Sequence, residues 1–149
     1  YQSRYNTGEF QILCEHLYQL IDAHRLQEVD LPSIALISPY REQVIRMTQV
    51  VKEDPRLQDV DLDINTIDGF QGQESDVVYI TLVRSNRHQN IGFLKDYRRM
   101  NVALTRARQQ LIVIGDSATI GTDSFYEAFL DYCEKEGSYQ TAWAYMLQG

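Results

Sequence analysis

Apolar side chains recur along this chain with two different spacings. Where they return every three or four positions, one side of a helix becomes apolar, and this spacing predicts amphipathic helices. Residues 8–26 and 41–53 show it most clearly, and further helices are predicted over 96–108 and 123–136. Thr7 precedes the first helix, where a threonine hydroxyl can cap a free backbone N–H.

Shorter apolar runs of strand length lie between the predicted helices. They are rich in β-branched residues and cover 34–38, 64–67, 77–83 and 110–115. The run at 34–38 carries no charge and fits a parallel strand buried on both faces. Strands that alternate with helices predict an α/β fold with a mostly parallel sheet covered on both sides.

The size of the chain fits one such domain, because 149 residues with 44% apolar content can form a single core. No run of 18 or more apolar residues occurs, and residues 1–10 lack the order of a signal peptide. We therefore expect a soluble, cytoplasmic protein without a membrane partner. Cys14 and Cys133 belong to no CxxC motif and are expected to be buried free thiols, and we expect no metal ligands in this chain.

The distribution of charge along the chain leads to a different conclusion about a nucleic-acid partner than the net charge does. A net charge of −7 argues against a nucleic-acid partner, since phosphate binding usually requires a basic surface. However, residues 84–108 hold seven of the fourteen basic side chains and one acid, so this segment carries +6 and the remainder −13. A solvated charged face is the alternative interpretation of such a run.

The segment 38–44, SPYREQV, is the first candidate for chemistry. It places Tyr40 and Arg41 directly after a predicted strand, where parallel sheets bind ligands. Tyr40 can stack on a base and Arg41 can reach a phosphate. The alternative is structural: Tyr40 closes the core and the Arg41 stem lies along apolar surface.

The segment 66–76, TIDGFQGQESD, is the second candidate and joins two predicted strands. Gly69 and Gly72 would let the backbone approach a ligand closely, and the Glu74 carboxylate can accept hydrogen bonds from ribose hydroxyls. A tight connection between strands is the alternative.

The segment 98–116 is the most specific candidate, with Arg98 and Arg99 at the start of a predicted helix and Arg106 at its end. A guanidinium can neutralise the charge of a reacting phosphate, so Arg106 is a candidate arginine finger. No GxxxxGK[ST] occurs in the chain, so it is not expected to hold ATP with Mg²⁺ alone.

Taken together, these segments resemble the motifs of superfamily 1 helicases. The matching strings are SxxNxxE at Ser3, Asn6 and Glu9, SPYREQ at 38–43, TIDGFQGQESD at 66–76, VRSN at 83–86, and GFLKDYRRMNVALTRAR at 92–108. FQGQE, VRSN and RRMNVALTRAR are similar to the 5′-to-3′ subgroup that contains the RNA helicase of nonsense-mediated decay and related bacterial DNA helicases. The resemblance implies a RecA-like three-layer α/β/α sandwich over residues 1–149, the second motor domain of a longer protein.

The resemblance also implies roles for individual residues. Tyr40 would pack on adenine, Gly72 and Glu74 would approach phosphate and ribose, and Arg106 would be the arginine finger, with Arg41 as a second phosphate contact. Gln43 would support the loop that carries Tyr40.

Other residues would serve the second ligand, single-stranded DNA or RNA. Contacts to the strand are implied for Thr66, Arg84, Ser85 and Asn86, and coupling of the strand to the ATP site for Gln71, Arg98 and Arg99. The Walker lysine and the Mg²⁺ ligands would belong to the first RecA-like domain, either of the same protein or of another chain.

Two other functions fit parts of the pattern. A RecA-like module without catalysis could serve in assembly or nucleic-acid capture. A dinucleotide-dependent oxidoreductase would share the α/β pattern, but no GxGxxG follows the first predicted strand.

Overall fold

The computed structural model describes residues 7–70, 73–82, 103 and 105–115. Its elements, in chain order, are α1 (Thr7–Leu26), β1 (Ile34–Ser38), α2 (Arg41–Glu53), the short 3₁₀ helix η1 (Pro55–Leu57), β2 (Leu62–Thr66), β3 (Ser75–Thr81) and β4 (Ala107–Ile114). The two helices predicted from the N-terminal half are present with the predicted ends, apart from one residue at the start of α1.

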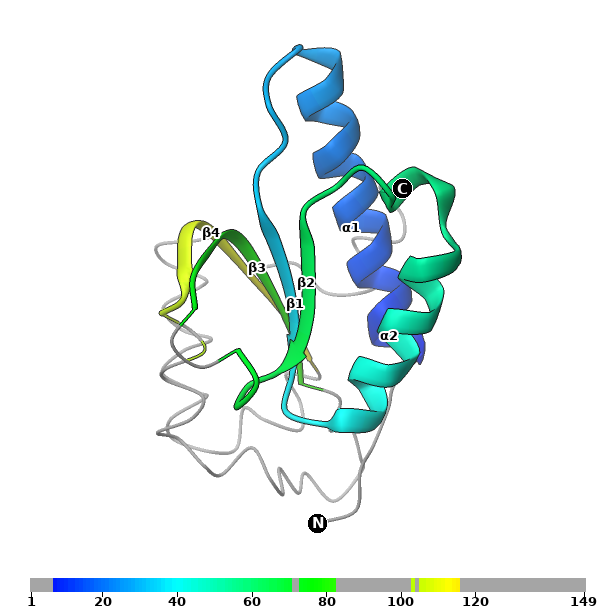
Figure 1. The fold of residues 1–149 in the computed structure, drawn as a ribbon, viewed down its shortest axis with the longest axis vertical. Helices are drawn as coiled ribbons and strands as arrows, with labels where there is room; N and C mark the ends of the chain where they lie inside the picture. Colours follow the sequence, from blue (N-terminus) through cyan, green and yellow to red (C-terminus); the bar gives the residue numbers. More distant parts are fainter. Residues whose placement is uncertain (1–6, 71–72, 83–102, 104, 116–149) are drawn as a thin grey trace.

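The four strands form one parallel sheet in the order β2-β1-β3-β4 (Figure 1). Each parallel connection has to return the chain to the opposite edge of the sheet. α2 makes this return between β1 and β2, whereas the segment 67–74 makes it between β2 and β3. The predicted α/β fold with a parallel sheet is confirmed.

Successive residues of β1 point to opposite faces of the sheet, and both faces are buried. Ile34 and Leu36 belong to an apolar cluster with residues of α1 and α2, which lie side by side on the same face (Figure 1). Ala35 and Ile37 belong to a second cluster on the other face. The members of this second cluster from outside the sheet are Ile67, Phe70, Leu82 and Ala103. The uncharged run at 34–38 is therefore the buried strand that its composition predicts.

The start of β4 differs from the prediction. β4 begins at Ala107, so residues 107 and 108 are strand where the sequence predicts the end of a helix. The first residues of β4 after Ala107 are polar and exposed, and the apolar pattern becomes visible only at Leu111. Pairing with β3 extends the strand beyond its apolar part, and a pattern of hydrophobicity does not reveal this.

Polar contacts fasten α1 to the rest of the domain. Nδ1 of His16 shares a hydrogen bond of 2.7 Å with the hydroxyl of Tyr79, a fully buried residue of β3. Burial lowers the pKa of His16, which favours the neutral ring. The Tyr18 hydroxyl donates to the Asp54 carboxylate, and the Arg56 guanidinium lies 3.6 Å from the centre of the Tyr18 ring.

Cys14 is a free thiol, as predicted, but it is half-buried rather than fully buried. Burial is the main cause that raises its pKa to about 11. The thiol is thus protonated near neutral pH and a poor nucleophile. Cys133 lies outside the described residues.

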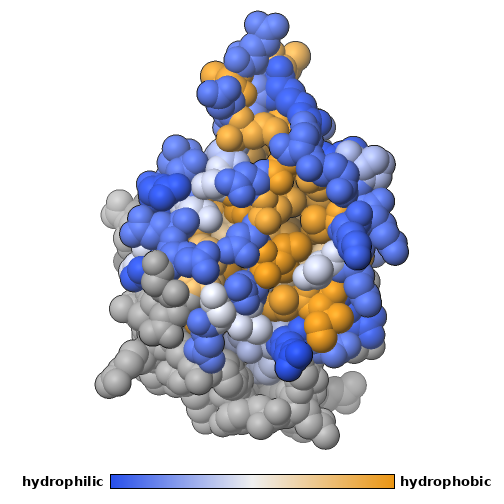
Figure 2. Space-filling model, in the orientation of Figure 1, coloured by the Kyte–Doolittle hydropathy of each residue, from blue (hydrophilic) through white to orange (hydrophobic). Residues whose placement is uncertain are grey.

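Some large apolar side chains of the described residues remain exposed: Leu26 (86%), Val29 (50%), Val50 (45%) and Ile45 (40%). Figure 2 shows apolar side chains near the end where α1 projects and across the middle of one face. Among the residues described, no helix combines the length and apolar character needed to cross a membrane.

Candidate functional site

The carboxyl ends of β1 and β2 bring three of the predicted site residues to one edge of the sheet. Ser38 pairs with Thr66 at the ends of these strands, and the Ile67 N–H donates to the Ser38 carbonyl at 3.2 Å. The chain then turns at Pro39 into α2, whose first residue is Arg41. Tyr40, Arg41 and Thr66 therefore lie at the same edge.

Arg41 is exposed at the beginning of α2, next to backbone N–H groups that have no partner within the helix. A cation at this position is disfavoured by the helix dipole, and an anion bound beside it would reverse that effect. The location is thus suited to a phosphate contact.

Tyr40 is fixed from the backbone side, because its N–H donates to the buried Ser38 hydroxyl at 3.2 Å. Its side chain is only 4% exposed. In this arrangement the ring completes the core, which is the structural alternative stated above. Stacking on adenine would require neighbouring side chains to uncover the ring.

The turn after β2 is built on Thr66. Its hydroxyl accepts from the Gly69 N–H at 3.1 Å, and its carbonyl accepts from the Phe70 N–H at 3.0 Å. The Thr66 N–H in turn donates to the side-chain oxygen of Asn65 at 3.0 Å. The hydroxyl oxygen, the N–H and the carbonyl of Thr66 are therefore all engaged within the turn, so a contact with a ligand would be additional to these hydrogen bonds.

Gly69 is required in this turn because the Asn65 side chain occupies the space that a Cβ would need. A Cβ on Gly69 would lie 2.0 Å from the Asn65 side-chain oxygen.

We expect Gly69→Ala to lower the free energy of unfolding by about 1–3 kcal/mol, the usual cost of overpacking. In an Asn65→Ala background the same change should cost much less. Urea denaturation of the wild type, the two single variants and the double variant measures this coupling, and equal costs in both backgrounds would show that the clash is not the cause.

Glu74 and Arg106 lie at the opposite, amino edge of the sheet. Glu74 comes directly before β3 and Arg106 directly before β4, and these strands are parallel neighbours. The Ser75 N–H donates to the Arg106 carbonyl at 3.3 Å, so the backbones of the two segments are hydrogen-bonded to each other. Glu74 therefore lies at the edge opposite Tyr40, Arg41 and Thr66.

A β-bulge in β4 begins two residues after Arg106. Ser75 pairs with Ala107 but Val77 pairs with Gln110, so Asp76 faces two residues of β4, Arg108 and Gln109. A bulge of this kind redirects side chains and is frequent next to functional sites. Here it brings the Arg108 guanidinium to 3.0 Å from the Asp76 carboxylate.

Arg108, Asp76 and Ser33 form a polar cluster at this edge. The Ser33 N–H donates to Asp76 at 3.2 Å, and the Asp76 N–H donates to the Ser33 hydroxyl at 3.0 Å. The hydrogen bond from the Ser33 backbone, followed by that from Arg108, lowers the pKa of Asp76. Arg108 also lies 4.0 Å from a carboxylate oxygen of Glu74. This cluster was not predicted from the sequence, although Arg108 is part of the basic segment 84–108.

The two edges are far apart. Ser33 directly precedes β1 and Ser38 is its last residue, and the five steps of about 3.3 Å between them give a separation of about 17 Å. The structure therefore does not bring Tyr40 and Glu74 together directly. The segment from Ile67 to Glu74 runs from one edge to the other, and its Ile67 and Phe70 side chains pack against the face of the sheet opposite α1 and α2.

Several predicted site residues fall outside the part of the chain that the structure describes. They are Gln71 and Gly72 in the crossing segment, and Arg84, Ser85, Asn86, Arg98 and Arg99 in the basic segment.

A buried polar chain at the carboxyl edge was not predicted. The Thr81 hydroxyl donates to the Glu9 carboxyl at 2.6 Å and accepts from the Gln43 side-chain amide at 3.2 Å. All three side chains are buried. Glu9 and Gln43 belong to strings that carry the helicase resemblance, whereas Thr81 looks like an ordinary β-branched strand residue.

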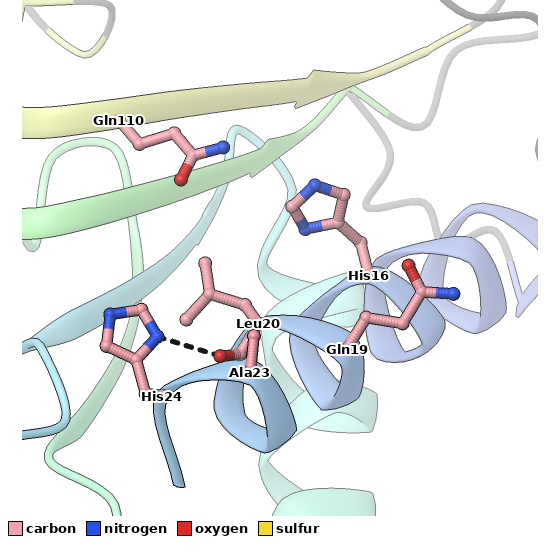
Figure 3. Close-up of a pocket in the computed structure, with 6 residues that line it drawn as sticks. All are labelled: His16, Gln19, Leu20, Ala23, His24 and Gln110. Carbon is pink, nitrogen blue, oxygen red and sulfur yellow. Dashed lines mark hydrogen bonds between the residues drawn. The ribbon is translucent and has the colours of Figure 1, made fainter. Parts of the chain in front are cut away.

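A shallow groove of about 270 Å³ lies between α1 and β4 (Figure 3). His16, Gln19, Leu20, Ala23 and His24 line it from α1, and Gln110 lines it from β4. The His24 ring already bonds the Leu20 carbonyl at 2.8 Å. None of the predicted site residues that the structure describes lines this groove. Within the described ranges, no group of three or more His, Cys, Asp or Glu side chains is placed to hold a metal ion.

The four-stranded parallel sheet with its helices is an α/β arrangement of the RecA-like kind. A protein family described as "AAA domain" matches residues 1–118. The chain belongs to this family.

Relatives with curated names agree with the helicase resemblance. The chain is 40% identical to "DNA-binding protein SMUBP-2" of Mus musculus, over 97% of this chain and 14% of that protein. It is also 40% identical to "DNA polymerase alpha-associated DNA helicase A" of Saccharomyces cerevisiae, over 89% of this chain and 19% of that protein. "Helicase sen1" of Schizosaccharomyces pombe is 39% identical over 87% of this chain and 8% of that protein. The chain thus spans less than a fifth of these relatives, and its resemblance to superfamily 1 helicases is confirmed.

Proposed function

We propose that this chain is the second motor domain of an ATP-dependent superfamily 1 helicase that acts on single-stranded DNA or RNA. The first RecA-like domain of the same protein would supply the Walker lysine and the Mg²⁺ ligands. This domain would supply the arginine finger, the adenine and ribose contacts, and part of the nucleic-acid track.

The observation that carries the proposal is the adjacency of Arg106 and Glu74 at the amino edge of β3 and β4. A backbone hydrogen bond of 3.3 Å, between Ser75 and Arg106, joins the segments that carry them. Arg106 is half-exposed and Glu74 is exposed, so both side chains are accessible from outside the domain. A cation beside a carboxylate suits a ligand that presents phosphate and ribose hydroxyls together.

A nucleotide bound along the crossing segment would reach both edges of the sheet. The segment from Ile67 to Glu74 itself spans the separation of about 17 Å between the edges. Because ribose is bonded directly to adenine, one nucleotide in this arrangement would reach Tyr40 with its adenine or Glu74 with its ribose, but not both. In either case its phosphates would approach Gly72, with Arg41 as a second phosphate contact. Since Tyr40 is only 4% exposed, stacking on adenine would require its ring to become accessible when the two motor domains close on the nucleotide.

Mg²⁺ would neutralise phosphate charge when bound, but we assign it no ligand among the described residues of this chain. This domain would therefore contribute by positioning the nucleotide and by supplying positive charge. Arg106 would place a fixed positive charge beside the transferred phosphate, where it stabilises the negative charge that develops.

The nucleic-acid track would follow the carboxyl edge. Thr66 lies there, and Arg84, Ser85 and Asn86 follow β3 in the sequence by a few residues. Gln71, Arg98 and Arg99 would couple the track to the ATP site. The charge of +6 over residues 84–108 supports a phosphate-binding role for this segment.

ATP hydrolysis by the full-length protein tests the proposal. We expect hydrolysis to be stimulated by poly(dT) or poly(U), and a forked duplex to be unwound only when ATP is present. The 149-residue domain alone should hydrolyse little ATP and bind single strands weakly, with an affinity that falls as salt rises. Nucleic-acid binding without any ATP hydrolysis by the full-length protein would instead identify a non-catalytic module.

A further inference from the structure

We propose that Glu9, Thr81 and Gln43 are positioning residues that hold the nucleotide-binding turn and the nucleic-acid strand in a fixed relation. The inference rests on the proposed function and assigns a part in it to three residues that contact neither ligand.

The three residues join three different elements at the carboxyl edge of the sheet. Glu9 is in the first turn of α1, Gln43 is in the first turn of α2, and Thr81 is the last residue of β3. The Thr81 hydroxyl uses its single proton for Glu9 and a lone pair for Gln43. Thr81 therefore ties both helices to the end of one strand.

Because the three side chains are buried, breaking the hydrogen bonds between them would cost free energy. The exposed fractions are 7% for Glu9, 1% for Gln43 and 0% for Thr81. A buried polar group is costly unless its hydrogen bonds are made, so the helices cannot shift relative to β3 without breaking a bond. Apolar side chains would fill the same space with less directional constraint. The chain is thus suited to fixing one particular arrangement.

The elements it joins are those that carry the proposed ligands. Gln43 lies two residues after Arg41 and three after Tyr40, which turn into α2 directly from β1. Thr81 lies three residues before Arg84, the first residue of the predicted nucleic-acid segment. The Tyr40–Arg41 turn is therefore linked to the end of β3 by the Thr81 hydroxyl in addition to the pairing of β1 with β3.

The test measures the ratio of ATP turnover with saturating poly(dT) to turnover without it, in the full-length protein. Thr81→Val keeps the shape of the side chain and removes the hydroxyl. We expect this ratio to fall at least fivefold, the lower end of typical coupling between sites. Thr81→Ser keeps the hydroxyl and should restore the ratio. Thr48→Val, at an exposed threonine of α2, is the matched control and should leave the ratio unchanged.

A role in stability alone predicts a different result. Thr81→Val would then lower the melting temperature but keep the wild-type ratio, and this outcome would overturn the inference. If Thr81→Val does not fold, Gln43→Met removes the amide from the α2 side and is judged by the same ratio. A wild-type protein that hydrolyses ATP without any response to poly(dT) or poly(U) would overturn the proposed function itself, and the inference with it.

Discussion

Replacing Arg106 with alanine is expected to reduce ATP hydrolysis by the full-length protein about 10³- to 10⁵-fold, the contribution of an arginine finger in GTPase systems. The reason is geometric as well as electrostatic. Arg106 directly precedes β4, and the paired strands and the bulge after it fix its backbone. A positive charge on such a rigid support is suited to stabilising a transition state without reorganisation.

The measurement is single-turnover hydrolysis together with the dissociation constant of a non-hydrolysable ATP analogue. Nucleotide binding should change little, because a finger acts mainly on the transition state. Arg46→Ala is the control, since Arg46 is an exposed arginine of α2 that pairs weakly with Glu42 at 3.8 Å. Arg106→Lys keeps the charge and loses the planar fork, so it should recover only part of the rate. Wild-type hydrolysis by Arg106→Ala would refute the assignment of the finger.

The elements with the strongest patterns could be predicted from the sequence. β1 occupies the predicted residues 34–38, and α2 occupies the predicted residues 41–53. Both have apolar positions dictated by burial: β1 is buried throughout, and α2 turns one side to the sheet. β2 begins at Leu62, two residues before its predicted start, because it is half-buried along its whole length and its pattern is correspondingly weak.

The site could be predicted only in part, because the sequence identifies side chains but not their neighbours. Glu74 and Arg106 were both expected near the nucleotide, and the pairing of β3 with β4 does bring their segments together. Their location at the amino edge was not predicted, since it depends on which strand each residue precedes. Thr81 pairs with residues 38 and 72 positions away, and no local spacing reports such contacts.

Replacing Leu36 with alanine should have the largest effect on folding of the changes considered. Leu36 is 0% exposed and lies on β1, between β2 and β3, with its side chain in the cluster formed with α1 and α2. Truncating a fully buried leucine typically costs about 2–5 kcal/mol, as lost burial plus the cavity left behind. We expect this loss in the free energy of unfolding from urea denaturation, with an unchanged dependence on urea.

Leu26→Ala is the matched control because it makes the same chemical change at a side chain that is 86% exposed. Its effect should stay within about 0.5 kcal/mol. The comparison isolates packing of the helical layer against the sheet, since both variants lose the same atoms. Equal small losses at Leu36 and Leu26 would contradict the arrangement of α1 and α2 on this face. A large loss at Leu36 alone would support it, and with it the position of β1, whose end carries Ser38 and the turn to Tyr40.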